Sequence, residues 1–421
     1  MAPEQKKRQR VCVIGAGIIG VTAAYQLQKH GFEVTLVDKE GVATGASYGN
    51  AGHFATEQVF PLADIKLLLQ LPKMLLDPLG PIRVKPNYFI SALPWFFRFI
   101  LNMFPNKKHH NTQAIKALNA LAISELKHIA SDVGCSQLLK LDGNLVVFEN
   151  TPLSIVVREW RAYSEAGVAV RLISGEEARK LEPELSEKIE HALFFTETGH
   201  TSDPKALCLA IFEKFKMSGG RFLKTHIVDV TESKVQVSGF DNREASIELE
   251  FDKTLITAGA WSKPICQQVG HDTPLDTERG YHLMLQTHVG LTRPVASYER
   301  KIIITPMVDG TRLAGMVEFG GLNNPATVGG ANRFKVHGQA IIPMLNDEAH
   351  FEGAEEWMGF RPSFPDSLPV ISGTKNENIF ASFGHQHLGL TWSAISAKLI
   401  TQKIMGKEPD IELSPYRIDR F

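Results

Sequence analysis

The sequence has few cysteines, no long apolar run and almost no net charge, and each absence excludes a class of protein. The four cysteines lie far apart without a C-x-x-C pair, which argues against a disulfide framework or a structural zinc site; they are Cys12, Cys135, Cys208 and Cys266. Sparse cysteines are typical of a reducing compartment, so we expect a cytoplasmic protein that holds no metal. No stretch of about 18 apolar residues predicts a membrane span, and the net charge of −1 favours no nucleic-acid partner.

Repeats and low-complexity linkers are also absent, and the chain of 421 residues has the size of about two globular domains. The basic start, MAPEQKKRQR, leads directly into a short apolar run. That run is too short and too soon broken by glycine for the core of a signal peptide. We therefore expect the first residues to form a solvated tail.

What the sequence does contain is a dinucleotide-binding pattern near its start. Val11–Ile14 is a short apolar run of the kind that forms a buried parallel strand. Gly15, Gly17 and Gly20 follow with G-x-G-x-x-G spacing, which allows a tight turn, a close approach of pyrophosphate and close packing of the next helix. Ile18–Lys29 is predicted to be that helix, with its N-terminal amides facing the diphosphate.

A second strand and an acidic residue complete the pattern. Val34–Val37 is apolar, and Asp38 follows it, where a carboxylate can accept hydrogen bonds from ribose hydroxyls. An ordinary glycine-rich turn would not require strand, glycines, helix, strand and acid in this order. The motif alone leaves FAD and NAD both open.

Periodicity and turn residues predict further elements, and the capping-box spacing of Ser174 and Glu177 predicts one more short helix. Helices are expected over Thr112–Ile129, Leu153–Ala166, Pro204–Met217 and Ala394–Met405. Strands are expected over Gly143–Phe148, Arg221–Val230, Lys234–Phe240, Ala245–Phe251, Gly280–Gln286, Lys301–Val308 and Thr311–Phe319, the last two joined as a hairpin. Thr254–Trp261 is expected to be an apolar strand that runs into a glycine turn. This order suggests a discontinuous nucleotide domain with a second domain built from insertions.

Four stretches carry a resemblance to a known family over nearly the whole chain. They are Val11–Glu40, "GASYGNAGH" (Gly45–His53), "TLITAGAW" (Thr254–Trp261) and "GFRPSFPDSLPVISGTKNENIFASFGHQHLGLT" (Gly359–Thr391). Together they resemble the FAD-dependent amino-acid oxidoreductases of the glycine oxidase, sarcosine oxidase and bacterial D-amino-acid dehydrogenase type. "RGYHL" (Arg279–Leu283) and "NAGH" favour the dehydrogenase branch, and "GHQHLGLT" is similar to enzymes that act on D-proline and cis-4-hydroxy-D-proline.

This resemblance implies a mixed α/β fold. A glutathione-reductase-like, FAD-binding Rossmann domain would occupy about 1–60, 191–270 and 353–421. An inserted, mainly antiparallel substrate domain would occupy about 61–190 and 271–352.

The implied activity is oxidation of a D-amino or D-imino acid by hydride transfer to FAD, giving an imine or keto acid. Three alternatives stay open: an oxidase of glycine or N-methyl amino acids, a flavin-carrying subunit of an electron-transfer complex, and an NAD(H) dehydrogenase. Oxygen, a quinone and a carrier protein all remain possible electron acceptors.

The cofactor is expected to be non-covalent FAD, because no cysteine lies in the flavin-facing motifs. The residues that the motifs and the resemblance assign to it are Gly15, Gly17, Ile18, Ile19, Gly20, Asp38, Lys39, Ser47, Asn50, Ala51, Gly52, Val228, Gly259, Trp261, Gly384, His385, Leu388, Gly389, Leu390 and Thr391.

Five residues are expected to act on the substrate. The resemblance implies that Arg361, in "GFRPS", binds the substrate carboxylate through two parallel hydrogen bonds; an interdomain salt bridge is the alternative. Tyr281 would donate to the same carboxylate unless it is only packed. His53 could bind substrate or tune the flavin, and His385 or His387 could accept the ammonium proton; each has a structural alternative.

Two neighbours of Tyr281 are weaker candidates. Arg279 is the next choice for the carboxylate, and His282 should face away from Tyr281 because side chains alternate along a strand.

"YFISALPWFFRFILNMFP" (Tyr88–Pro105) allows two interpretations. It could be an interfacial helix that holds the protein at the inner face of a membrane, near a quinone. We favour a helix of the substrate domain packed on its sheet.

Overall fold

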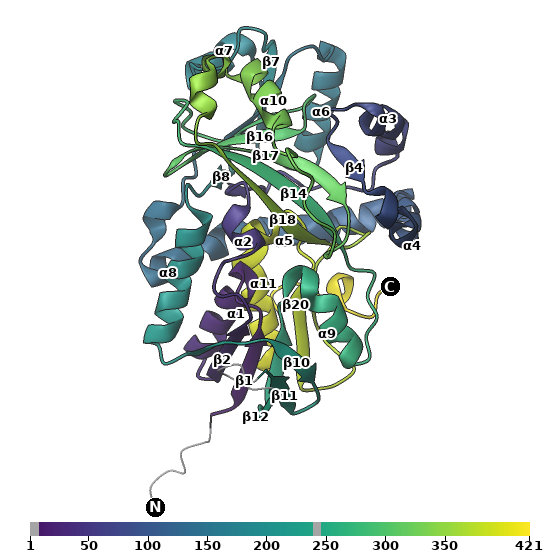
Figure 1. Ribbon diagram of the computed structural model, residues 1–421, viewed down its shortest axis with the longest axis vertical. Helices are drawn as coiled ribbons and strands as arrows, with labels where there is room; N and C mark the ends of the chain where they lie inside the picture. Colours follow the sequence, from purple (N-terminus) through teal and green to yellow (C-terminus); the bar gives the residue numbers. More distant parts are fainter. Residues whose placement is uncertain (1–7, 239–245) are drawn as a thin grey trace, which may run out of the picture.

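The computed structural model describes residues 8–238 and 246–421, which form two stacked units (Figure 1). The tail expected at the start falls partly on residues 1–7, outside the described residues. Residues 239–245 also lie outside them, and they include the end of one predicted strand and the start of the next.

The lower unit, here called the parallel-sheet unit, is built on six strands whose apolar runs are mostly buried. β1 lies between β2 and β13 and pairs in parallel with both, so Ile14 stands beside Val37 and Ile256. Only β19 pairs antiparallel. In order across the sheet the strands are β19 (Val370–Gly373), β20 (Ile379–Phe383), β13 (Lys253–Ile256), β1 (Arg10–Ile14), β2 (Glu33–Asp38) and β9 (Arg221–Lys224).

Four helices share an apolar core with one face of this sheet: α1 (Ile18–Lys29), α5 (Pro105–Val133), α8 (Pro204–Met217) and α11 (Gly389–Ile404). α1 and α8 have the predicted bounds. α5 is longer than expected and ends at Gly134, whose left-handed φ of 79° stops the helix. α11 begins at Gly389 rather than Ala394, because burial of its first turn outweighs the weak helix propensity of Gly389 and Thr391.

The opposite face carries a small sheet of β10 (Ile227–Val230), β11 (Lys234–Val237) and β12 (Ile247–Glu250) together with α9 (Ser262–Gln268). The single strand predicted over 221–230 is therefore wrong. The chain runs along β2 as β9, and the Thr225 N–H donates to the Asp38 carbonyl at 2.9 Å. It then enters the small sheet as β10.

The upper unit, here called the antiparallel-sheet unit, is a mixed sheet in which most neighbours are antiparallel. The hairpin predicted between β16 and β17 is confirmed, because Met307 pairs with Gly310 across a two-residue turn. In order the strands are β18 (Glu355–Ser363), β14 (Asp276–Leu285), β17 (Gly310–Phe319), β16 (Ile302–Met307), β15 (Val295–Ser297), β5 (Asn144–Phe148), β7 (His191–Phe195) and β6 (Val170–Ser174), with β4 (Ile82–Val84) beside β17.

Helices cover the upper face of this sheet in Figure 1. The capping box predicted at Ser174 and Glu177 is present at the start of α7. The covering helices are α6 (Leu153–Glu165), α7 (Gly175–Leu181) and α10 (Arg333–Ile341), and the short elements α2 (Ala46–Gly49), β3 (His53–Phe54) and β8 (Gly199–His200) lie between the two units.

The predicted domain limits remain a proposal. Strand pairing and helix packing, however, place three elements in the other unit than the one predicted for them. β7 and β18 fall in the predicted FAD-binding segments and yet pair in the antiparallel sheet. α5 falls in the predicted substrate segment and packs on α11, and the Tyr416 hydroxyl donates to the Ala114 carbonyl at 2.7 Å. Hydrogen bonding and packing, not loop positions, determine to which unit an element belongs.

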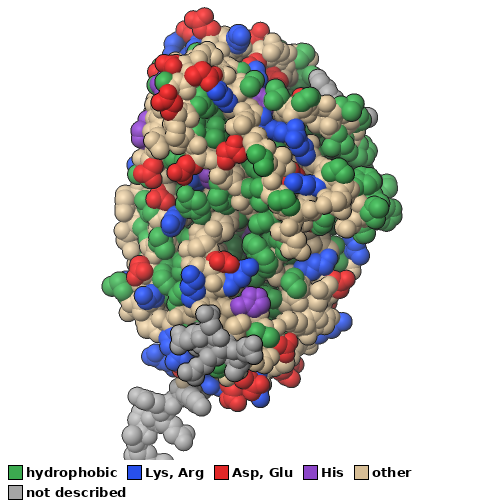
Figure 2. Space-filling view, in the orientation of Figure 1, with side chains coloured by type: hydrophobic (Ala, Val, Ile, Leu, Met, Phe, Trp, Pro, Cys, Tyr) green, Lys and Arg blue, Asp and Glu red, His purple; other side chains and the backbone are tan. Residues whose placement is uncertain are grey.

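α3 (Ile65–Leu76) and α4 (Phe89–Leu101) project from the right-hand side of Figure 1. α4 packs on the sheet as favoured, since the Trp95 ring contacts Phe319 at 5.1 Å and its Nε1 donates to the Ser363 carbonyl. Its other face stays uncovered, and hydrophobic side chains gather along this edge (Figure 2). No helix in residues 8–238 and 246–421 is long and apolar enough to cross a membrane.

Candidate active site

A cavity of about 1390 Å³ lies between the two units and takes its walls from residues between Ile14 and Leu390. Typical small-molecule pockets measure about 300–1,000 Å³, so this one is large enough for a dinucleotide and a second small molecule. Sixteen of the twenty residues predicted to bind the cofactor line it; Gly20, Gly52, Leu388 and Thr391 lie behind the wall.

The glycine motif forms one end of the cavity. Gly15 has a left-handed φ of 107°, and a Cβ on Gly20 would lie 1.8 Å from the Gly15 carbonyl oxygen. Gly17 faces the Ser47 hydroxyl, which accepts from the Ile18 N–H at 2.8 Å at the start of α1. The bare backbone at this helix end fits a pyrophosphate.

Asp38 stands at the end of β2 on the same wall. Its carboxylate accepts from the N–H groups of Ala16, Glu40 and Gly41 at 2.8–3.0 Å. A carboxylate has about four acceptor sites, so capacity remains for a ribose hydroxyl.

Beyond Asp38 the wall continues with residues that fit the adenine end of a dinucleotide. Val228 and Trp261 are both partly exposed and line the cavity. The Lys39 ammonium lies 5.2 Å from the centre of the Trp261 ring.

Asn50 and Thr391 shape the middle of the site through backbone contacts. The Asn50 amide donates to the carbonyls of Ala46 and Ser47, and its oxygen accepts from the Gly52 N–H at 2.8 Å. The Thr391 hydroxyl accepts from the Ala55 N–H and so fixes α11 against the loop after β3. Both polar side chains already have hydrogen-bond partners within the protein, and these bonds position the wall of the cavity.

Arg361 projects from β18 at the other end of the cavity. Its guanidinium crosses above Gly280, where a Cβ would lie 2.3 Å from Nη2, and donates to the carbonyls of Met316 at 2.7 Å and Gly315 at 3.3 Å. Arginine has five N–H donors, so these two bonds leave donors for a ligand. Arg361 lines the cavity, as predicted for the residue that binds a carboxylate.

Glu278 is a cavity residue that the sequence analysis missed. It pairs with Arg361 in the register of β14 and β18 and is buried. Burial raises the pKa of Glu278, and the positive charge of Arg361 opposes the rise. Glu278 lies two residues before Gly280 and hence on the same strand face, which was a signal available in the sequence.

His53 is held at both ring nitrogens. Nδ1 lies 3.0 Å from the Gly199 carbonyl oxygen and Nε2 lies 2.8 Å from Glu57 Oε1. Burial lowers the pKa of His53, but the Glu57 carboxylate and the Gly199 carbonyl more than reverse this, and the net shift is upward. Glu57, also missed from the sequence, is buried in the cavity wall, and its second oxygen has no hydrogen-bond partner.

His385 and His387 both line the cavity, and Gln386 between them has a left-handed φ of 51°. His385 is buried, its Nε2 contacts the Ser396 hydroxyl at 2.9 Å, and burial lowers its pKa to about 3. Burial, together with the charges of Arg361 and His53, lowers the pKa of His387 to about 4, so its ring is neutral near pH 7.

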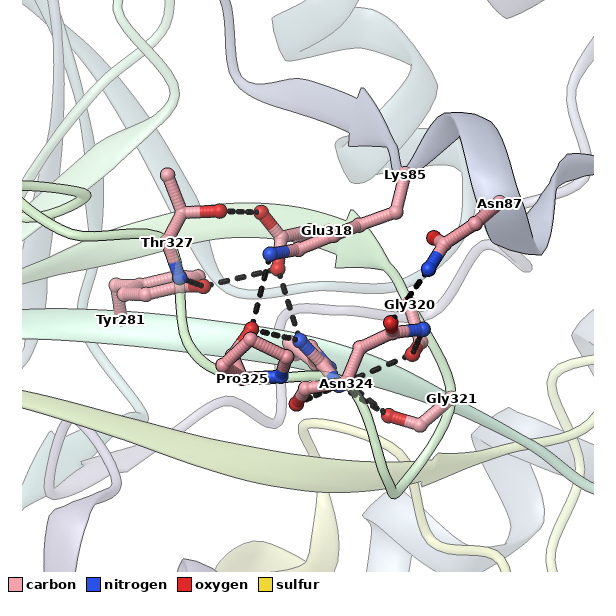
Figure 3. A network of polar contacts seen from close by, with 10 residues as sticks. Lys85, Asn87, Tyr281, Glu318, Gly320, Gly321, Asn324, Pro325 and Thr327 are labelled. Atoms are coloured by element: carbon pink, nitrogen blue, oxygen red, sulfur yellow. Dashed lines mark hydrogen bonds and ion pairs between the residues drawn. The ribbon is translucent and has the colours of Figure 1, made fainter.

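Tyr281 lines the cavity, but its hydroxyl belongs to a hydrogen-bond network around Glu318 (Figure 3), and Arg279 is part of the same network. The Tyr281 hydroxyl donates to Glu318 Oε1 at 2.9 Å and accepts from the Thr327 N–H at 3.0 Å. This differs from the expected contact with a substrate carboxylate, because the hydroxyl already has a donor and an acceptor partner. His282, as expected, faces elsewhere: its Nδ1 contacts the Gly49 carbonyl and its ring stacks on Trp357.

Arg279 is fully buried and is absent from the cavity wall. It forms an ion pair with Glu318 at 3.2 Å. The rest of its guanidinium donates to backbone carbonyls, those of Gly320, Gly321, Asn324 and Pro325. It therefore has no place for a substrate carboxylate.

No cysteine of the described residues lines this cavity, and all four cysteines are buried. Among the described residues, no cluster of three or more His, Cys, Asp or Glu is placed to hold a metal ion.

Known proteins match this chain over nearly its full length. The model of the family described as "FAD dependent oxidoreductase" matches residues 10–403. The chain is 30% identical to a D-amino-acid oxidase of Bradyrhizobium diazoefficiens, over 98% of this chain and 99% of the relative. It is 26% identical to a D-amino acid dehydrogenase of Vibrio atlanticus, over 98% and 99%. The crystal structure of glycine oxidase from Geobacillus kaustophilus superposes with a TM-score of 0.72 at 19% identity, covering 98% of this chain and 99% of that one.

Proposed function

The chain belongs to the FAD-dependent oxidoreductase family, and within that family we propose that it oxidises a D-amino or D-imino acid at Cα. The family's cofactor removes the NAD(H) alternative. The cavity supports FAD in the proposed position, with a glycine-lined helix end at one side and a free guanidinium edge at the other. We assign the pyrophosphate to the start of α1, the ribose to Asp38 and the adenine end to the wall of Val228 and Trp261.

When bound, FAD supplies the ring that accepts the hydride equivalent from Cα. The residues of this chain then have to fix the substrate, remove water and take up a proton. Arg361 is the residue that carries the proposal. Its remaining N–H donors face the cavity, and two parallel hydrogen bonds from them would fix both oxygens of a carboxylate.

His387 is our candidate for the proton acceptor. Its ring lines the cavity and is neutral near pH 7, and a substrate carboxylate bound to Arg361 would offset part of the positive charge that lowers the pKa of His387. His385 is the weaker choice because its Nε2 already contacts Ser396. An imidazole nitrogen of His387 would accept the proton of the substrate ammonium, unless the substrate binds as the free amine.

The D-configuration and a cyclic substrate are the finer parts of the proposal. The two curated relatives are named for D-amino acids, and "GHQHLGLT" is similar to enzymes of cyclic D-imino acids. The His387 ring takes up space beside the substrate, which favours a compact ring such as D-proline or cis-4-hydroxy-D-proline. The electron acceptor is a quinone, a carrier protein or oxygen.

A panel of D- and L-amino acids with an artificial dye acceptor tests this proposal. D-proline and its hydroxylated analogue should reduce the dye fastest, and L-proline should be much slower. Faster turnover of L-proline, glycine or sarcosine would reject the D-assignment. An anaerobic titration tests the alternative of an electron-transfer subunit, because flavin that no amino acid bleaches would contradict an oxidase or dehydrogenase.

A further inference from the structure

One edge of the molecule carries more exposed large hydrophobic side chains than its length of chain would predict. Ten of the twenty exposed large hydrophobic side chains in the described residues fall within 65–104, about a tenth of the chain. They are Ile65, Leu75, Leu76, Leu79, Phe89, Ile90, Leu93, Phe97, Ile100 and Phe104. Contiguous patches of this kind mark surfaces for proteins or membranes.

The pattern on α4 is that of a helix with one unpartnered side. Its exposed residues recur at helical spacing from Phe89 to Ile100, and Ile90 and Phe97 are 79% and 64% exposed. The opposite side is closed by Trp95, which stacks on Phe99 and packs on Phe319. α4 therefore rests on the protein by one face and presents the other to the outside; we call this outer side, with the exposed residues of α3, the α4 face.

The charged side chains on α4 and on both sides of it are basic, whereas Asp77, directly after α3, is acidic and exposed. Between Asp77 and Glu125 the sequence contains no acidic residue. The basic side chains of this stretch are Arg83, Lys85, Arg98, Lys107, Lys108 and Lys116. Arg98 and Lys107 are exposed at the C-terminal side of α4, and Lys108 is paired with Asp64.

We propose that the α4 face docks on an anionic lipid surface, with Phe89, Ile90, Leu93 and Phe97 inserted among the acyl chains and the basic residues at the headgroups. Aromatic and aliphatic side chains flanked by Lys and Arg are the composition of interfacial helices. A second copy of the chain fits less well, because a two-fold contact would place the same positive charge against itself. The docking needs no particular substrate, and so it stands apart from the proposed function.

α3 connects this surface with the cavity. Leu67 and Met74 line the cavity, whereas Ile65, Leu75 and Leu76 are exposed on the α4 face. A single helix therefore separates the lipid surface from the space where the reaction takes place.

The first experiment is co-flotation of the purified holoenzyme with vesicles of phosphatidylcholine alone or mixed with phosphatidylserine. Binding should require phosphatidylserine and decrease with salt, since screening weakens attraction between exposed charges. Equal binding to both vesicles, or no binding to either, would overturn the proposal.

Variants locate the surface. Ile90→Gln combined with Phe97→Gln should abolish flotation and leave flavin content and turnover in solution unchanged. The matched control is Met217→Gln with Val308→Gln, which changes two side chains of 81% and 57% exposure beside α8, on the other side of the molecule. Arg98→Gln and Lys107→Gln should each weaken binding about fivefold.

Each remaining outcome decides against lipid. If the control pair lowers flotation as much as the α4 pair, vesicle binding does not depend on the α4 face. If the wild type is a dimer that the α4 pair converts to a monomer, the face is a protein interface. Because flotation is read without substrate, its result is independent of the D-amino-acid assignment.

Discussion

Arg279 and Arg361 lie on the neighbouring strands β14 and β18, and both were candidates for binding a carboxylate. Arg279 is fully buried and directs its guanidinium to Glu318 and four backbone carbonyls. Arg361 donates to two carbonyls and turns the rest of its guanidinium to the cavity. The residue type is the same, but the number of unused donors separates a side chain that holds the fold together from one that can hold a ligand.

The difference predicts two kinds of mutant. Replacing a side chain whose donors are all used leaves its buried partners unpaired and should lower stability. Replacing a side chain that has unused donors should mainly change substrate binding and turnover.

The largest effect is expected for Arg279→Met. Breaking a buried ion pair from one side leaves Glu318 uncompensated, and the free energy of unfolding should fall by about 3–5 kcal/mol. Thermal and denaturant unfolding measure it, with Arg361→Met as the matched control, which should change stability much less. Equal losses in both variants would remove the distinction.

The next effect is expected for Arg361→Ala, which should lower kcat/KM by about tenfold to a hundredfold, since a charge-assisted bond contributes about 1.5–3 kcal/mol. Flavin content should stay near that of the wild type. Arg361→Lys keeps the charge but loses the two-pronged geometry, so it should also be impaired.

An amide of the amino acid sharpens this test, because the wild type should strongly prefer the free acid and Arg361→Ala should lose that preference. A variant that retains full discrimination would show that another group anchors the carboxylate.

A third prediction concerns the ion pair of His53 and Glu57. The pKa of His53 is raised in the folded state, so its contribution to stability is complete below the unfolded pKa of about 6.5 and is lost as pH rises through the folded pKa. Each unit of this rise corresponds to about 1.4 kcal/mol. Melting temperatures measured from pH 6 upward should therefore decline less in Glu57→Gln than in the wild type, and parallel curves would contradict the ion pair.

The smallest effect is expected for Tyr281→Phe. It removes the hydroxyl that joins Glu318 and Thr327, so stability should fall by about 1 kcal/mol while kcat/KM changes little. A tenfold loss of kcat/KM at unchanged stability would restore Tyr281 as a substrate-binding residue.

The features that could be predicted from the sequence are those that depend on residues close together in the chain. The dinucleotide unit depends on glycines, apolar runs and Asp38 that lie within about 30 residues of each other, and its strands, helix and turn formed as predicted. Local patterns also located β14, β16 and β17. The capping box placed α7 correctly, and α8 has the bounds that the sequence predicted.

What failed depends on contacts between distant residues. Whether Tyr281 reaches a substrate depends on Glu318 and Thr327, and the roles of Glu57 and Glu278 depend on His53 and Arg361. The strand predicted over 221–230 divides because one half pairs with β2 and the other with β11. Sequence alone gives the residue types but not which donors remain unused.

The order of the central sheet has a consequence for how the protein is made. β1 is complete by Ile14, but its neighbour β13 ends at Ile256 and the next strand, β20, at Phe383. At about 5–20 residues per second, a ribosome needs on the order of 20 s or more to deliver these partners, and until then the edge of β1 that pairs with β13 stays open. Because the cavity wall also includes Leu390, the cofactor site cannot close until the chain is nearly finished. We therefore expect a chain that ends before Leu390 to retain no flavin.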